Sequence, residues 1–230
     1  LPRGVGANWP RTLAVMPVGP LVRLPWAALP MPDGRALCEA LELRVVPGLR
    51  LGLTAPHGAP GGEAPLVIAA DPGNLENVGP ETRMVLDAFP GARLLSGGDA
   101  TAERFLALAP RAEWIHFAGH GCHHADAPHQ SGLMFADRWL PASELARVRL
   151  SARWVILSAC QTARALVRPG GEWFGLARTL LLCGARTVIA SQWDIEDAAA
   201  LQLMAELYPR LGVGQALGAA LAGAQAARAR

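Results

Sequence analysis

The sequence contains no lysine, and all 21 of its basic residues are arginine. These arginines are scattered, and the formal net charge is only +2 at pH 7, so the chain has no basic patch of the kind that binds nucleic acid. The absence of lysine also excludes a P-loop, whose GxxxxGK[ST] pattern needs that residue. The glycine pairs at residues 97–98 and 170–171 are therefore not expected to form a nucleotide site.

Cysteines and long apolar runs are also scarce. The four cysteines lie far apart and no two form a CxxC pair, which fits a reduced intracellular protein better than a disulfide framework. No apolar run reaches about 18 residues, the minimum for a membrane span, and residues 1–4 do not open a signal peptide. We therefore expect a cytoplasmic protein without membrane contact. The missing initiator Met predicts a fragment of a longer protein or a processed start.

The remaining composition is that of a globular α/β protein, with 51% hydrophobic and 17% charged residues in a chain of 230. Short apolar runs typical of buried strands alternate with helical patterns, which predicts a mostly parallel central sheet covered by helices on both faces. A seam is expected in the glycine- and proline-rich loop 57–62, so that residues 1–62 form an N-terminal β-rich part and residues 63–230 the main domain. The strands are expected near 66–70, 92–95, 113–118, 153–158 and 187–191, the helices near 81–89, 101–108, 172–183, 195–211 and 214–230, and an extended N-terminal run at 21–25.

Two of the predicted strands end in polar turns that carry a potential catalytic group. His120 follows the strand near 113–118, and Cys160 follows the strand near 153–158. If these strands are neighbours in a parallel sheet, both side chains emerge at the carboxyl edge, where ligands bind in such folds. The thiolate is the nucleophilic form of cysteine, and a nearby imidazole can produce it. The pair is therefore a candidate dyad, with Cys160 as nucleophile and His120 as base.

The surroundings of the candidate dyad fit this chemistry. Gly119 and Gly121 flank His120, and glycine at these positions is expected to let the backbone approach a substrate. The amides of Gly121 and Cys160 are candidates for an oxyanion hole. All six histidines precede Cys160, which excludes the papain-like order; the caspase-like order, with histidine upstream by about 50 residues, remains, and His120 precedes Cys160 by 40.

Alternative interpretations of the same residues remain open. His116 lies within its strand and is expected to be a hydrogen-bonded core histidine. Cys160 by itself would more often be a small buried hydrophobe, and Cys183, at a helix end, is expected to be buried and inert. The run of His120, Cys122, His123, His124 and His129 contains zinc-ligand residue types, but its spacing matches no closed zinc site, so the last three are expected on an exposed loop.

Five ordered stretches resemble the successive motifs of the CHAT domain, a family grouped with caspases, separases and gingipains among the cysteine peptidases. Residues 21–29 also resemble the N-terminal strand region of the family, so the resemblance covers nearly the whole chain. The five stretches are IHFAGHG at 115–121, VILSACQT at 155–162, EWFGLAR at 172–178, GARTVIASQW at 184–193 and LYPRL at 207–211.

The resemblance implies a caspase-like fold and a cysteine endopeptidase in which His120 is the base, Cys160 the nucleophile, and the amides of Gly121 and Cys160 the oxyanion hole. It implies no cofactor and no metal. In several related peptidases an Asp two residues before the cysteine selects a basic P1 residue; Ser158 stands there in this chain, and Gln161 stands where relatives commonly have Glu. A simple preference for Arg or Lys is therefore not predicted, and Ser158, Trp193, Asp194 and Asp197 are candidates for lining the substrate pocket.

The function expected from this resemblance is cleavage of a specific protein substrate in a bacterial regulatory, antiviral defence or cell-death pathway. The resemblance also implies regulatory segments or partner proteins such as tetratricopeptide repeats. A non-catalytic interaction module with the same fold is the alternative from another class, and a metal-dependent hydrolase using the histidine-rich loop is a third.

Overall fold

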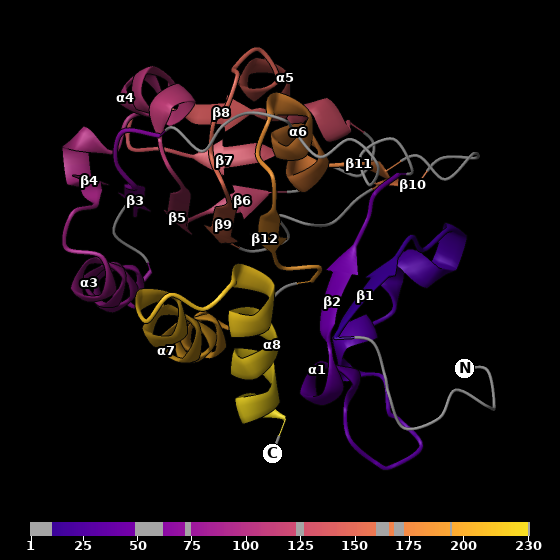
Figure 1. Ribbon diagram of the computed structural model, residues 1–230. Coiled ribbons are helices and arrows are strands. Elements are labelled where there is room, and N and C mark those ends of the chain that lie inside the picture. The colour runs from indigo at the N-terminus through magenta and orange to yellow at the C-terminus, as the bar shows by residue number, and fades with distance from the viewer. Residues whose placement is uncertain are drawn as a thin grey trace.

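A five-stranded parallel sheet forms the centre of the molecule (Figure 1). The computed structural model describes residues 11–48, 62–71, 75–122, 127–159, 166–167, 173–193 and 195–229. The strand order is β12-β9-β5-β3-β4, and every neighbouring pair is parallel. This confirms the predicted mostly parallel sheet. Its strands are β3 (Leu66–Ala70), β4 (Arg93–Ser96), β5 (Ile115–Gly119), β9 (Val155–Ser158) and β12 (Val188–Ala190).

Helices cover both faces of this sheet, as predicted (Figure 1). One face packs against α4 (Ala102–Leu108), α5 (Ala142–Leu145) and α6 (Leu176–Cys183). The other packs against α3 (Val78–Ala88), α7 (Asp197–Gly212) and α8 (Leu217–Arg228). Side chains of a strand alternate between the two cores. In β5, Ile115 and Phe117 join the first core while His116 faces the second, as does Trp114 directly before the strand.

Two helix ends follow the sequence signals. Thr101 caps α4 by accepting a hydrogen bond from the Arg104 amide at 3.2 Å. Gly184 ends α6 with a φ of +119°, a left-handed conformation that favours glycine. The helix expected from residue 172 begins only at Leu176, because Trp173 and Phe174 form β11 instead, paired with β10 (Leu166–Val167).

A small antiparallel sheet follows β5 directly. It consists of β6 (Gly121–Cys122), β7 (Gly132–Met134) and β8 (Trp139–Pro141). Short 3-10 turns, η3 (Gly97–Asp99), η4 (Ala109–Arg111) and η5 (Pro128–Gln130), connect the neighbouring elements. Because β6 begins two residues after β5 ends, the chain around His120 is held between the two sheets.

The N-terminal elements form a separate two-stranded sheet beside α8 (Figure 1). In it β1 (Thr12–Val15) pairs in parallel with β2 (Glu42–Val45), and η1 (Gly19–Arg23), η2 (Trp26–Ala28) and α1 (Leu37–Ala40) connect them. The prediction of an extended run at 21–25 was wrong, since residues 21–23 lie in η1, where Pro20 fixes the first turn. The expected seam at 57–62 falls almost entirely outside the described residues, which resume at Gly62.

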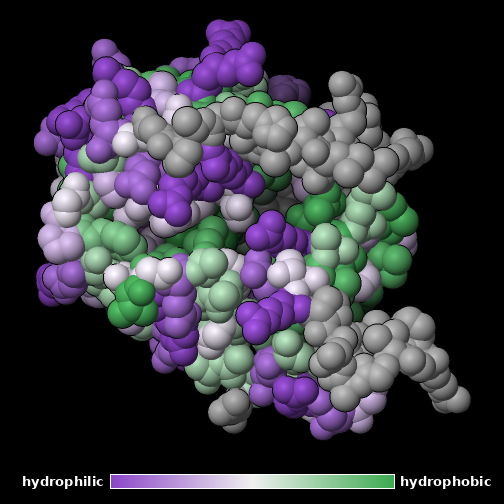
Figure 2. Space-filling view, in the orientation of Figure 1, coloured by the Kyte–Doolittle hydropathy of each residue, from purple (hydrophilic) through white to green (hydrophobic). Residues whose placement is uncertain are grey.

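The surface of this N-terminal part carries several exposed apolar side chains. Met16, Val18 and Leu21 are each about half exposed. Figure 2 shows hydrophobic residues gathered on this side of the molecule, over β1 and η1.

Among the helices that the structure describes, none is long and apolar enough to cross a membrane.

Candidate active site

The two strands that precede the predicted dyad are direct neighbours. β5 and β9 pair in parallel, with Ala118 opposite Ser158. The predicted adjacency of these strands is thereby confirmed, and their carboxyl ends lie at the same edge of the sheet. His120 and Cys160 each follow this residue pair by two positions in the sequence. Cys160 falls outside the described residues, so its geometry with His120 stays a prediction.

His120 is half-buried, between the end of β5 and the start of β6. Its backbone carbonyl accepts a hydrogen bond from the Met134 amide of β7 at 2.9 Å. In the antiparallel ladder this bond lies beside the pair of Gly121 and Leu133. These two residues are therefore a pair that exchanges no backbone hydrogen bonds. The N–H of Gly121 therefore points away from β7, toward the side of β6 on which no described strand pairs.

The glycine before His120 has a packing role. A side chain on Gly119 would overlap the backbone carbonyl of Ala70, its partner in β3. Gly119 is also buried. Close packing between β5 and β3 thus requires glycine here, while the approach of this backbone to a substrate stays a prediction.

A buried polar chain lies directly beneath the carboxyl end of β9. The hydroxyl of Ser158 donates to Oε2 of Glu81 in α3 at 2.9 Å. The other oxygen of Glu81, Oε1, lies 3.0 Å from Nε2 of His116, at ion-pair distance although the pair lacks good hydrogen-bond alignment. Nδ1 of His116 lies 2.7 Å from the hydroxyl of Tyr208 in α7. His116 is fully buried and partnered, which confirms the prediction of a core histidine.

Tyr208 is the fully buried end of this chain. Burial, and secondarily the charge of Glu81, raises the pKa of the Tyr208 hydroxyl well above its ordinary value, so the hydroxyl stays protonated. A protonated hydroxyl can donate to Nδ1 of His116 or accept from it, and the tautomer of the ring decides which. Ser158 donates to the Glu81 carboxylate directly, and Tyr208 reaches the same carboxylate through His116.

Sequence reasoning missed Glu81 and Tyr208. Glu81 is only 2% exposed, and it shares the buried face of α3 with Val78, Thr82 and Val85. A carboxyl group on the apolar stripe of a helix is the signal that could have revealed it, because buried acidic residues occur almost only with partners.

The candidate pocket residues near the start of α7 differ from one another in exposure and contacts. Trp193, three residues after β12, is 47% exposed. Asp197, the first residue of α7, is half-buried and accepts hydrogen bonds from the backbone and side chain of Asn77. Asp194 lies outside the described residues. Of these acidic candidates, Asp197 is therefore occupied in joining α7 to α3.

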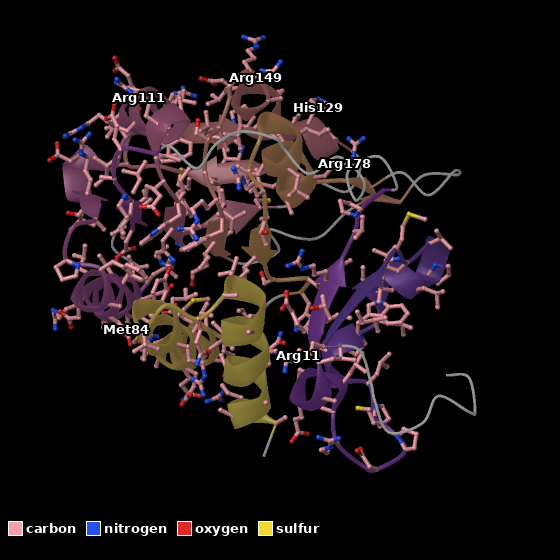
Figure 3. The ribbon with its side chains drawn as sticks, in the orientation of Figure 1. Arg11, Met84, Arg111, His129, Arg149 and Arg178 are labelled. Carbon is pink, nitrogen blue, oxygen red and sulfur yellow. The ribbon has the colours of Figure 1, made fainter. Side chains whose placement is uncertain are left out.

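The histidine-rich segment contributes no described metal site. Among the residues that the structure describes, no three His, Cys, Asp or Glu side chains lie together as metal ligands. His129 is exposed in η5, at the upper periphery of the view in Figure 3, as expected for a loop histidine. His123 and His124 lie outside the described residues.

The described cysteines differ sharply in exposure. Cys183 is buried, as predicted, and its thiol donates to the Leu145 carbonyl at 3.3 Å. Burial raises the pKa of the Cys183 thiol, and the positive charge of Arg149, labelled in Figure 3, opposes this to a smaller extent. Burial likewise raises the pKa of Cys38, whereas Cys122 is exposed. Cys38 and Cys183 therefore have the character of packed, inert thiols.

Comparisons with known proteins agree with this fold. The family model of the CHAT domain matches residues 3–230. A chain of the Saccharomyces cerevisiae separase–securin complex is similar in structure, with a TM-score of 0.64 at 18% sequence identity over 91% of this chain. The match spans only 14% of that longer chain, and at this identity it shows a shared caspase-like fold. No curated protein matches the sequence. The family model covers almost the whole chain, and the chain therefore belongs to the CHAT domain family, which relates it to the caspase-like peptidases.

Proposed function

We propose that the chain is a cysteine endopeptidase that cleaves a specific protein substrate with Cys160 as nucleophile and His120 as general base. The observation that carries the proposal is the register of β5 and β9, with Ala118 opposite Ser158 and a candidate catalytic residue two positions beyond each. The half-burial of His120 supports it as well, because a general base must be reachable by substrate yet shielded from bulk water.

The proposed reaction has two halves. The imidazole of His120 takes the proton of the Cys160 thiol, and the thiolate attacks the carbonyl carbon of the scissile peptide bond. The C–N bond then breaks as the imidazolium gives its proton to the leaving amine, leaving a thioester. Water, deprotonated by His120, attacks the thioester and releases the acid product and the thiol. No metal or cofactor takes part in these steps.

The negative charge that develops on the carbonyl oxygen needs hydrogen-bond donors. The proposal assigns this role to the amides of Gly121 and Cys160. The direction of the Gly121 N–H, away from β7, supports the assignment because the ladder does not use this donor. Ser158, Trp193, Asp194 and Asp197 are proposed to contribute to the substrate pocket, and the exposure of Trp193 favours an apolar contact there.

The proposed setting is a bacterial regulatory, defence or cell-death pathway, with tetratricopeptide-repeat or similar segments controlling the domain. The proposed substrate is one specific protein of that pathway. The resemblance to the family is the support for this setting.

Incubation with candidate partner proteins tests the proposal. Cys160→Ala and His120→Ala are each expected to reduce cleavage about a thousandfold or more, since a dyad acts as a unit. Cys122→Ala, which removes an exposed cysteine from the neighbouring β6, is the matched control and is expected to cleave normally. Cleavage that survives Cys160→Ala and stops with a chelator would refute the dyad. Partner proteins that bind the domain but are not cleaved by it would identify a non-catalytic interaction module.

A further inference from the structure

We propose that Glu81 is a positioning residue for this reaction, acting through Ser158 on the segment that carries Cys160. The inference rests on the proposed function, because it assigns Glu81 a role in placing that nucleophile. Glu81 is in α3, and its carboxylate reaches the last residue of β9, two residues before Cys160. Glu81 acts on Ser158 and not on the reacting atoms.

The burial of Glu81 gives the first reason. A carboxyl group that is 2% exposed has lost nearly all contact with water, which is costly unless its oxygens are paired. Packing alone does not call for it, because buried polar networks can often be replaced by apolar residues of similar volume without loss of stability. What an apolar residue could not do is accept the hydrogen bond of Ser158.

The orientation of the carboxylate gives the second reason. Its two oxygens have separate partners, with Oε1 facing His116 and Oε2 facing Ser158. His116 is itself oriented by Tyr208, and both are fully buried. The contacts with His116 and Tyr208 therefore fix the plane of the carboxylate from its buried side. Ser158 is the end of the chain nearest the surface, and its side chain is half-buried.

The next residue along the chain is held from the other side. Ser191, directly after β12, donates its hydroxyl to the backbone carbonyl of Ala159 at 2.9 Å. Ser158 and Ala159 are therefore anchored by α3 and by the end of β12. A nucleophile must lie within a few tenths of an ångström of its attack position, and a shift of about 1 Å can cost about a hundredfold in rate. Fixing the two residues before position 160 supplies this constraint.

The test measures the reactivity of Cys160 without a substrate. The probe is iodoacetamide at neutral pH, with the alkylation of each cysteine followed by mass spectrometry of its peptide and normalised to the exposed Cys122. Glu81→Gln and Ser158→Ala are each expected to slow alkylation of Cys160 about tenfold, because a thiol displaced from His120 is less ionised and the thiolate is the form that reacts. The double variant is expected to be no slower than the slower single variant, because both substitutions break the same contact.

Two further variants separate positioning from a general loss of structure. Ser158→Thr keeps the hydroxyl and is expected to restore most of the rate lost in Ser158→Ala. Thr82→Val changes the residue next to Glu81 and is expected to leave the Cys160 rate unchanged. Thr82 is 6% exposed, and its hydroxyl has no hydrogen-bond partner among the described residues. Melting temperatures of all variants show whether any loss follows unfolding. If Glu81→Gln does not fold, the pair Ser158→Ala and Ser158→Thr decides alone.

The outcomes separate this inference from the proposed function. If His120→Ala slows Cys160 alkylation but Glu81→Gln and Ser158→Ala do not, the positioning role is overturned and the dyad stands. If Cys160 reacts no faster than Cys122 and His120→Ala has no effect, the proposed function fails first. Multiplicative effects in the double variant would also overturn the inference, since Glu81 would then act by a route other than Ser158.

Discussion

Asp197 accepts two hydrogen bonds from Asn77, one from its backbone amide at 3.1 Å and one from its side-chain amide at 2.8 Å. Asn77 directly precedes α3 and Asp197 begins α7, so the carboxylate joins the amino ends of two helices on the same face of the sheet. A negative charge is favourable at a helix amino end as well.

Asp197→Ala is therefore expected to lower the free energy of unfolding by about 1–3 kcal/mol, because it leaves two half-buried donors without their acceptor. Urea unfolding followed by circular dichroism measures the change. Glu196→Ala is the matched control, an exposed neighbour expected to stay within about 0.5 kcal/mol. Unchanged stability of Asp197→Ala would contradict the role in joining α3 and α7, and an altered substrate preference would support the proposed contribution of Asp197 to the pocket.

Gly119→Ala is expected to destabilise the sheet by about 1–3 kcal/mol, because the added methyl group overlaps the Ala70 carbonyl in the adjacent strand. Gly79→Ala is the contrasting substitution. No atom of the described residues lies within 4 Å of the methyl group that it adds in α3, and alanine favours the helix, so a gain of about 0.5 kcal/mol is expected. Equal stability of the two variants in thermal unfolding would contradict the packing of β5 against β3.

The sheet was predictable because its strands are short apolar runs, and the edge that carries His120 follows from their parallel order. The buried chain was not predictable, because Glu81, His116 and Tyr208 come from three elements that only the fold brings together. The prediction that residues 21–23 are extended was wrong, because a glycine and a proline such as those at 19–20 occur in 3-10 turns as well as in hairpins. The start of α6 was misplaced because a helical pattern does not exclude the short β11 pairing.

Reactivity of the described cysteines is expected to follow their burial. Cys122 is expected to react fully with a thiol reagent in the folded protein, whereas Cys38 and Cys183 react only after unfolding because burial raises the pKa of each thiol. Titration with Ellman's reagent, with and without urea, distinguishes the two groups. Rapid reaction of Cys183 in the native protein would show that the packing of α6 against α5 opens.

Stability is expected to fall at alkaline pH, and Tyr208 offers a specific probe of that fall. The chain has one tyrosine and no lysine, so few groups other than the cysteines titrate near pH 10. Burial raises the pKa of Tyr208 in the folded state, so above its ordinary pKa of 10.0 only the unfolded state loses the proton. The stabilisation is complete below that pH and declines as pH rises toward the folded-state pKa, by about 1.4 kcal/mol per pH unit.

Urea unfolding between about pH 8 and pH 11 measures this decline, and the ultraviolet absorbance of tyrosinate reports when Tyr208 ionises. In Tyr208→Phe the decline over the upper part of this range is expected to be shallower, although the variant starts from a lower stability because Nδ1 of His116 loses its hydrogen-bond partner. Tyrosinate absorbance that appears near pH 10 in the folded protein would contradict the buried assignment.

The packing of α8 against α1 and β2 has a consequence for how the chain is made. Residues 37–45 contact residues 217–228, and Gly218 lies directly against the Glu42 side chain. On the ribosome α1 and β2 emerge long before α8 is translated, so the surface that they present to α8 stays uncovered while the central sheet assembles. Contacts of such long sequence separation form late and slowly. The N-terminal segment is therefore expected to be the last part to dock, and the stage most exposed to chaperones or to misassembly with another chain.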